Sequence, residues 1–299
     1  MPTKISRRSI LSGALLPFVS GRISAQTSID IIDIHQHTPY TGRSAAELVE
    51  HQKVMGIAKT ILLPAGRAYS LAAGVGGNDT AMALAKEHPN QYYFFVNELP
   101  DIPETRPTLE KYLKLGGIGI GEQKYHVDCD SKAIDLVASI AREFDVPVLL
   151  HFEHGAYNMN FQRFHKVLAK HSRVNFIGHA QTWWANIDKG HDQEVLYPRT
   201  KVTAGGISDR LLSDYPNMFG DLSANSGLNS LLRDEDHARG FLKRHQDKLL
   251  FGSDCSDKLG QGKLCIGSNQ IATVRRLAPD EKVVAKIFNG NARRIMRIG

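Results

Sequence analysis

The sequence predicts a single α/β domain, a (β/α)8 barrel or TIM barrel, and three observations lead to this fold class. The chain has 299 residues, and about 250 residues make one complete barrel of this kind. Short apolar or β-branched runs alternate with segments of helical periodicity, which is typical of parallel α/β folds. Ionisable residues also gather where these runs end, and catalytic groups of such barrels lie at the carboxyl ends of the strands.

Eight runs have the length and composition of buried strands, and they span residues 31–34, 60–63, 92–96, 117–121, 147–150, 174–178, 218–222 and 249–252. Helical periodicity predicts helices over residues 45–55, 79–88, 108–115, 131–144, 161–171, 208–215, 234–245 and 280–296. Ser131 and Asp280 can cap the helices that they begin. Because no internal repeat or linker follows residue 30, residues 30–299 form one predicted domain.

The first 25 residues are typical of an export signal for the twin-arginine (Tat) route. The pair Arg7-Arg8 precedes an apolar stretch at residues 10–19, and small residues up to Ala25 predict cleavage near that position. The apolar stretch is about half of the roughly 20 residues that cross a bilayer, so we expect no membrane span. The sequence thus predicts a periplasmic protein that has the Tat export machinery as a partner.

The formal net charge of +6 lies mostly in this leader. The first 25 residues contain no acidic residue and four basic ones: Lys4, Arg7, Arg8 and Arg22. Subtracting these four charges leaves +2 for the rest of the chain. No block of like charges follows, so we expect no nucleic-acid partner. The three cysteines have no C-x-x-C spacing, so they allow at most one disulfide and are read as small buried residues: Cys129, Cys255 and Cys265.

Five of the eight predicted strand ends carry a histidine or an acidic residue. His35 and His37 follow the first strand and, two residues apart on an extended segment, project to the same side. The other four are Glu122, His151, His179 and Asp254, after strands four, five, six and eight. Buried histidine and aspartate are costly unless they are paired or bound. The pattern therefore predicts a metal site at the carboxyl end of the barrel.

These motifs resemble the signature of the amidohydrolase superfamily, in particular its amidohydrolase-related branch (amidohydrolase family 2), which also includes decarboxylases and lactonases. The resemblance spans about residues 30–299 and is carried by Asp33-Ile34-His35-Gln36-His37, by His151 and His179, and by Phe251-Gly252-Ser253-Asp254. It implies a barrel whose first-strand histidines hold metal, with further histidines after strands five and six. It also implies an eighth-strand Asp that binds metal or takes a proton.

Two arrangements of the metal are open at the fourth strand. Ile120-Gly121-Glu122 resembles relatives with two metals bridged by the Glu, and Lys124-Tyr125-His126 resembles relatives with one. With Glu122 as a ligand, one metal lies on His35, His37 and Asp254 and the other on His151 and His179. With Lys124 at the strand end, a single metal lies on His35, His37, His151 and Asp254, and His179 acts on the substrate. We favour the first arrangement.

Nitrogen and oxygen ligands with an open position suit zinc, although manganese and iron also accept them. Zinc lowers the pKa of bound water from 15.7 towards about 7, and we expect Asp254 to take the proton and return it to the leaving group. His179 or Lys124 can stabilise the oxyanion. The sequence thus favours a metal-dependent hydrolase of amides, esters or lactones over a metal-dependent decarboxylase or a non-catalytic binding barrel.

The substrate is expected to be a small molecule, and a carboxylated one would suit the basic residues near the strand ends. Arg43 and Arg67 follow the first two strands, where an arginine can pair with a substrate carboxylate. Trp183 closely follows His179 and is a candidate for the pocket wall. A homo-oligomer is compatible with this fold, although the sequence does not specify one.

Overall fold

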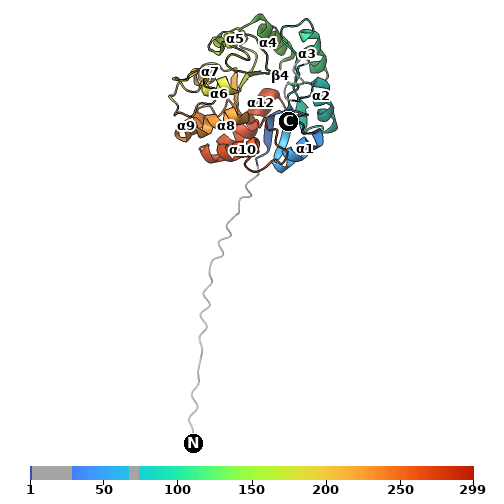
Figure 1. Ribbon diagram of the computed structural model, residues 1–299. Coiled ribbons are helices and arrows are strands. Elements are labelled where there is room, and N and C mark those ends of the chain that lie inside the picture. The colour runs from blue at the N-terminus through green and yellow to red at the C-terminus, as the bar shows by residue number, and fades with distance from the viewer. Residues whose placement is uncertain (2–28, 67–73) are drawn as a thin grey trace.

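The computed structural model describes residue 1, residues 29–66 and residues 74–299. Strands line the centre of the molecule and helices surround them (Figure 1). The strands are β1 (Ile31–Gln36), β2 (Ile57–Leu62), β3 (Tyr92–Phe94), β4 (Ile120–Gln123), β5 (Val148–His151), β6 (Phe176–His179), β7 (Met218–Asp221) and β8 (Leu249–Leu250). The predicted export signal and Arg67 lie outside the described residues.

All strand pairs are parallel, in the orders β1-β2-β3 and β4-β5-β6-β7-β8. Backbone hydrogen bonds also cross both seams between these two groups. At the first seam Val96 donates to the carbonyl of Gly119 at 2.8 Å. At the second seam Ile34 donates to the carbonyl of Phe251 at 3.1 Å, and Asp254 donates to that of His35 at 2.8 Å. The eight strands therefore form a closed barrel, as predicted.

The helices follow the strands in alternation as predicted, with three segments that the periodicity did not indicate: α6, α8 and α10. The helices are α1 (Ala45–Val54), α2 (Asn78–Glu87), α3 (Thr105–Lys114), α4 (Lys132–Phe144), α5 (His165–Lys170), α6 (Gln181–Ala185), α7 (Ile207–Asp214), α8 (Ala224–Leu232), α9 (Glu235–Arg244), α10 (Ile266–Leu277), α11 (Glu281–Ala285) and α12 (Asn291–Met296). A π-helical turn, Lys286–Gly290, joins α11 to α12. Ser131 and Asp280 accept hydrogen bonds from the first turns of α4 and α11, as expected of N-caps.

The apolar core has two parts. The larger part lies between the barrel and the surrounding helices. The smaller part fills the barrel interior with side chains from most of the strands, among them Ile32, Leu149 and Ile177. Ile295 and Met296 of α12 belong to this inner cluster, and Figure 1 shows α12 across the middle of the barrel. One end of the interior is thus filled with apolar side chains, which leaves the other end for polar groups.

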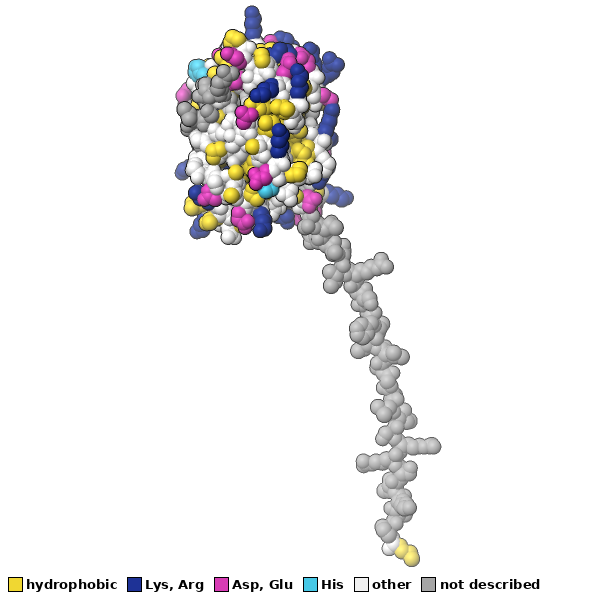
Figure 2. Space-filling model, turned by 90° about the vertical axis from the view of Figure 1, so that its right-hand side faces the viewer, with side chains coloured by type: hydrophobic (Ala, Val, Ile, Leu, Met, Phe, Trp, Pro, Cys, Tyr) yellow, Lys and Arg dark blue, Asp and Glu magenta, His cyan; other side chains and the backbone are white. Residues whose placement is uncertain are grey.

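The surface carries charges of both signs. On the face shown in Figure 2, basic and acidic side chains are interspersed. Among the helices of residues 29–66 and 74–299, none has the length and apolar character that crossing a lipid bilayer requires.

A buried charge cluster joins α7 to α9. Asp209 accepts hydrogen bonds from His245 at 2.6 Å and from Arg244 at 2.9 Å, and it is 6% exposed. Burial disfavours its charge, but these hydrogen bonds hold the pKa of Asp209 below its usual value. The cluster therefore stabilises the fold while Asp209 is ionised.

We expect Asp209→Asn to lower the free energy of unfolding by about 1–3 kcal/mol at pH 7, because a buried hydrogen-bonded charge loses its role. Since the folded-state pKa is depressed, the stabilisation is complete above the unfolded-state value of about 3.9. It is lost as pH falls through the folded-state pKa. Urea unfolding at pH 7 and at about pH 3 measures the loss of stability and its dependence on pH. The exposed Asp214→Asn on the same helix is the control. An equal difference at both pH values would contradict this assignment.

Candidate metal centre

The alternation of side chains along the strands places polar residues directly above the inner apolar cluster. Residues two apart on a strand face the same side. His151 therefore follows Leu149 of the inner cluster on the same face, and His179 follows Ile177 in the same way. These two histidines are paired in register across β5 and β6. Both β5 and β6 thus end in a buried histidine at the carboxyl end of the barrel.

The first group of candidate ligands comes from the seam between β1 and β8. The Nε2 atoms of His35 and His37 lie 3.2 Å apart, so both imidazoles face one point. The Oδ1 atom of Asp254 lies 3.4 Å from Nε2 of His37 and 3.9 Å from Nε2 of His35. These three side chains form one group whose donor atoms could share a metal ion.

The second group comes from β4, β5 and β6. Nδ1 of His151 contacts Oε1 of Glu122, and Nε2 of His179 lies 3.7 Å from the same oxygen. All three side chains are buried, and their donor atoms lie close enough to hold a second ion. The structure therefore brings together every candidate ligand of the sequence analysis, in two adjacent groups.

Glu122 lies between the two groups and faces both. Its Oε1 atom faces His151 and His179, while its Oε2 atom lies 3.6 Å from Nε2 of His35 and 3.7 Å from Nε2 of His37. A carboxylate can use its two oxygens for two different partners. The position of Glu122 therefore matches that of a carboxylate bridging two metal ions.

A further layer of buried groups orients the imidazoles. The carboxylate of Asp221, at the end of β7, lies 2.7 Å from Nδ1 of His35 and 3.2 Å from Nδ1 of His179. Nδ1 of His37 lies 2.7 Å from the carbonyl of Leu63. An acceptor at Nδ1 fixes the proton there, which leaves Nε2 free to bind a metal. Three of the four imidazoles are held in this way.

The sequence analysis missed Asp221 because the predicted strand 218–222 runs past it and hides a sixth polar strand end. The signal that could have found it is a lone aspartate in an apolar run, since a buried carboxylate needs a partner. Gly252, two residues after β8, permits the close packing around Asp221. A Cβ atom there would lie 2.5 Å from Oδ1 of Asp221 and 2.9 Å from Cβ of His35.

Asp33 fixes the seam that carries the first group. Its Oδ1 atom accepts a hydrogen bond from the backbone of Ser253 at 2.9 Å, and its Oδ2 atom accepts one from the Ser253 hydroxyl at 2.5 Å. The amide of Gln52 on α1 also donates to Asp33, at 3.0 Å. These contacts hold β1 against the residue before Asp254. Asp254 itself has a φ of +44°, a left-handed conformation that aspartate tolerates better than most residues.

The electrostatics of the centre suit a cation. Although burial opposes ionisation, the charge and hydrogen bond of His151 hold the pKa of Glu122 well below its usual value. His35 and His37 likewise lower the pKa of Asp254 to about 2 against the effect of burial, and the pKa of Asp221 is depressed by His35. Two buried carboxylates and one partly buried carboxylate thus lie ionised beside the imidazoles, and a divalent cation would balance their charge when the imidazoles are neutral.

A cavity of about 280 Å³ opens onto this centre. His37, Glu122 and Asp254 line it, so both groups of candidate ligands reach its wall. The rest of the lining combines polar and aromatic residues with small and apolar ones: Tyr40, Pro64, Ala65, Gly66, Val75, Asn97, Lys124, Tyr125 and Tyr157. The hydroxyl of Tyr40 donates to Asp254 at 2.9 Å. Such a cavity suits a small molecule.

Lys124 lies beyond the end of β4, in the wall of this cavity. Its ammonium lies 5.4 Å above the ring of Tyr157. Burial opposes its charge, but the carboxylates of Glu122 and Asp254 raise the pKa of Lys124, so it is a cation at neutral pH. Because β4 ends at Gln123, Glu122 lies within the strand end and Lys124 lies beyond it.

Two predicted substrate-binding residues lie elsewhere. Arg43 is buried and donates to Oε1 of Gln36 at 2.5 Å and to the carbonyl of Asp257 at 2.8 Å, so it holds loops together and does not line the cavity. Trp183 is fully buried and packs against Phe152 and Phe161 in the outer core. The short helix α6 turns it away from the cavity. Both positions correct the expectation from the sequence.

Comparison with known proteins confirms the fold. No family model and no curated protein matches the sequence significantly. An uncharacterised TIM-barrel protein from Bordetella bronchiseptica is similar with a TM-score of 0.66 and 15% identity, over 90% of this chain and 98% of that one. An amidohydrolase from Burkholderia multivorans with bound zinc gives a TM-score of 0.57 and 14% identity, over 90% and 100%. A 2,6-dihydroxybenzoate decarboxylase from Rhizobium gives 0.55 and 15%, over 90% and 99%.

We expect Asp221→Asn to weaken metal binding by about 10–100-fold, because an amide no longer fixes the protons of His35 and His179. Competition with a chromophoric chelator measures this affinity. Asp209→Asn, which also removes a buried carboxylate, is the matched control and should bind metal normally. If both variants keep the affinity of the unmodified protein, Asp221 does not position the ligands.

Proposed function

We propose that this chain is a metal-dependent hydrolase of the amidohydrolase superfamily that opens an amide, ester or lactone bond in a small molecule. The observation that carries the proposal is the position of Glu122, whose two oxygens face two separate pairs of histidines. Imidazole and carboxylate donors on strand ends, beside a small cavity, are the expected surroundings of a metal that activates water. The bound zinc of the similar Burkholderia amidohydrolase supports the same choice of metal.

The residues present fit two divalent ions better than one. His35, His37 and Asp254 would hold the first ion, and His151 and His179 the second, with Glu122 between them. His179 is 1% exposed and does not line the cavity, which supports a ligand role over direct action on the substrate. When bound, the metal supplies Lewis acidity, which lowers the pKa of water and polarises a carbonyl. Zinc is our first choice, with manganese and iron as alternatives.

The side chains of the cavity then divide the remaining work. Asp254 is ionised, since its pKa is held at about 2, and it reaches the cavity, so it can accept a proton from water and return it to the leaving group. The hydroxyl of Tyr40 holds one oxygen of Asp254 in place. Lys124 can bind a carboxylate or stabilise a developing oxyanion at the cavity wall. This replaces Arg43 as the expected partner of a carboxylated substrate.

We also propose that residues 1–25 direct Tat export to the periplasm, as the sequence analysis predicts. Export of an already folded chain would suit a centre whose ligands come from five different strands, because the ligands meet only in the folded barrel. Mass spectrometry of the mature protein tests the proposal. An N-terminus near residue 26 supports it, and an intact leader in the periplasmic fraction contradicts it.

We expect elemental analysis to find about two metal ions per chain, and Glu122→Gln to lose at least one of them, because an amide bridges two cations poorly. A variant that combines His35→Ala with His37→Ala serves as the reference for loss of the first group. An unchanged metal content in Glu122→Gln would remove the bridging role and favour a centre with one ion.

The reaction itself is tested by incubating the zinc-loaded protein with matched amides, esters and lactones, each with and without a carboxylate. We expect hydrolysis that stops on metal removal, and we expect Lys124→Met to raise KM about tenfold or more for the carboxylated members only. Lys111→Met, on the outer helix α3, is the control. Release of carbon dioxide without hydrolysis would instead identify a decarboxylase, and no turnover by the metal-loaded protein would favour a binding barrel.

A further inference from the structure

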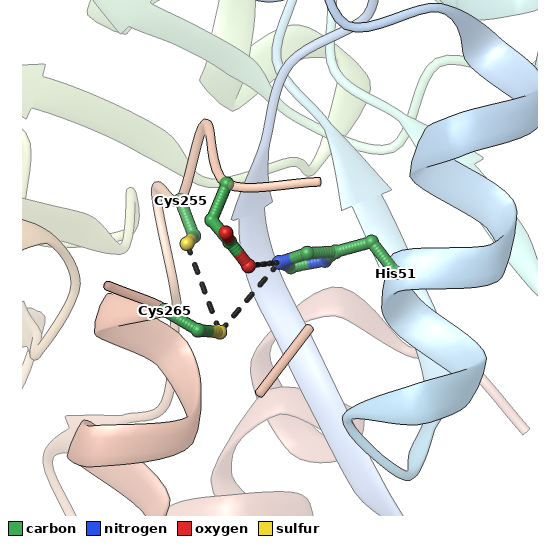
Figure 3. Close-up of side chains that lie close together, drawn as sticks. His51, Cys255 and Cys265 are labelled. Carbon is green, nitrogen blue, oxygen red and sulfur yellow. Dashed lines mark hydrogen bonds and ion pairs between the residues drawn. The ribbon is translucent and has the colours of Figure 1, made fainter. Parts of the chain in front are cut away.

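A second cluster of metal-binding side chains lies on the outer side of the barrel. His51 comes from α1, Cys255 and Asp257 come from the segment after β8, and Cys265 caps the N-terminus of α10. Figure 3 shows His51, Cys255 and Cys265 pointing toward one another from these separate elements. His51 and Cys265 are fully buried, and Cys255 is 1% exposed. None of the four belongs to the metal centre described above.

The spacing of the donor atoms suits one tetrahedral ion. The sulfur atoms of Cys255 and Cys265 lie 3.8 Å apart, and Sγ of Cys265 lies 3.7 Å from Nε2 of His51. Nε2 of His51 lies 3.8 Å from Oδ2 of Asp257, and all four donor atoms fall within 4.8 Å of one another. Zinc bonds of about 2.0–2.3 Å in a tetrahedron place neighbouring donors about 3.4–3.8 Å apart. The three distances of 3.7–3.8 Å lie at the upper end of this range.

The cluster leaves its imidazole without a strong partner. Among the described residues, Nδ1 of His51 has no hydrogen-bond partner, and Nε2 faces only Cys265 and Asp257 at distances too long for a strong hydrogen bond. A fully buried polar group in this state is costly unless something else satisfies it. A cation bound at Nε2 would give this nitrogen a strong partner.

Two of the other donors, Cys265 and Asp257, are already held in place by backbone amides. The backbone amide of Ser268, in the first turn of α10, donates to Sγ of Cys265 at 3.4 Å, which favours a thiolate. The backbone amides of Leu259 and Gly260 donate to Oδ2 of Asp257 at 3.0 and 2.8 Å. Ligands that are fixed before the ion arrives lose little freedom on binding it.

We propose that His51, Cys255, Cys265 and Asp257 bind a structural zinc ion. Two thiolates and one imidazole select zinc over the hard cations that prefer oxygen donors. With protein ligands at all four positions, no site is left for a substrate, as in other structural zinc sites. The ion would tie α1 to the segment that follows Asp254. This proposal does not depend on the reaction at the barrel mouth.

A disulfide between Cys255 and Cys265 is the competing state, since an exported protein meets an oxidising environment. That bond would require the sulfur atoms to approach to about 2.05 Å. It would also leave His51 without its nearest partner. The two states differ in thiol content, so one experiment separates them.

The test loads the full-length protein with Co²⁺ in place of zinc and records the near-ultraviolet absorption of cobalt bound to thiolate. We expect this band in the unmodified protein and in Cys129→Ser, which removes the buried cysteine outside the cluster. We expect Cys255→Ser combined with Cys265→Ser to lose the band and one zinc equivalent, while the metal centre keeps its own ions. The variant that combines His35→Ala with His37→Ala should keep the band. Failure of the proposed hydrolase activity can therefore be distinguished from failure of the proposed structural zinc site.

Titration of thiols in the denatured protein completes the test, and it does not require the double variant to fold. All three cysteines should react after the metal is removed. A single reactive thiol would show that Cys255 and Cys265 form a disulfide and would overturn the proposal. Absence of the cobalt–thiolate band in the reduced, unmodified protein would overturn it as well.

Discussion

The constraint that governs this structure is the burial of carboxylates beside imidazoles at one end of the barrel. Glu122 and Asp221 are ionised and buried, Asp254 is ionised and partly buried at the cavity wall, and each contacts at least one histidine. Buried charges are tolerated only with partners at short range. The strand register, the packing at Gly252 and the contacts of Asp33 all bring those partners together. The end of the barrel that carries the candidate metal centre is therefore also the part of the fold with the strictest geometric requirements.

Much of this could be predicted because it depends on periodicity. Alternation along a strand decides which residues face inward, so the predicted strand ends could place the candidate ligands His35, His37, His151 and His179 at one end of the barrel. The two-group arrangement around Glu122 was one of two open possibilities, and only the strand boundary at Gln123 separates Glu122 from Lys124. A boundary shift of two residues is too small for local sequence patterns to resolve.

Other features depend on contacts that are distant in the sequence. Helix α8 contains serine, asparagine and glycine, which favour helices weakly, yet Gly227 packs so closely that a Cβ atom would lie 2.1 Å from the carbonyl of Leu222. Trp183 is next to the ligand strand in sequence, but the absence of a side chain at Gly178 lets it enter the outer core. Arg43 pairs with Gln36 and with the segment near Asp257, more than two hundred residues away. Local composition carries no information about such partners.

The seam between β1 and β8 has a consequence for the order of events during folding. His35 and Asp254 come from opposite ends of the barrel domain, and they meet only through the backbone hydrogen bonds that close this seam. A nascent chain that has not yet delivered β8 has no complete first ligand group, however well its earlier strands have paired. If these residues bind an ion as proposed, the first ion could bind only late in folding, and its binding would report that the ring of strands is complete.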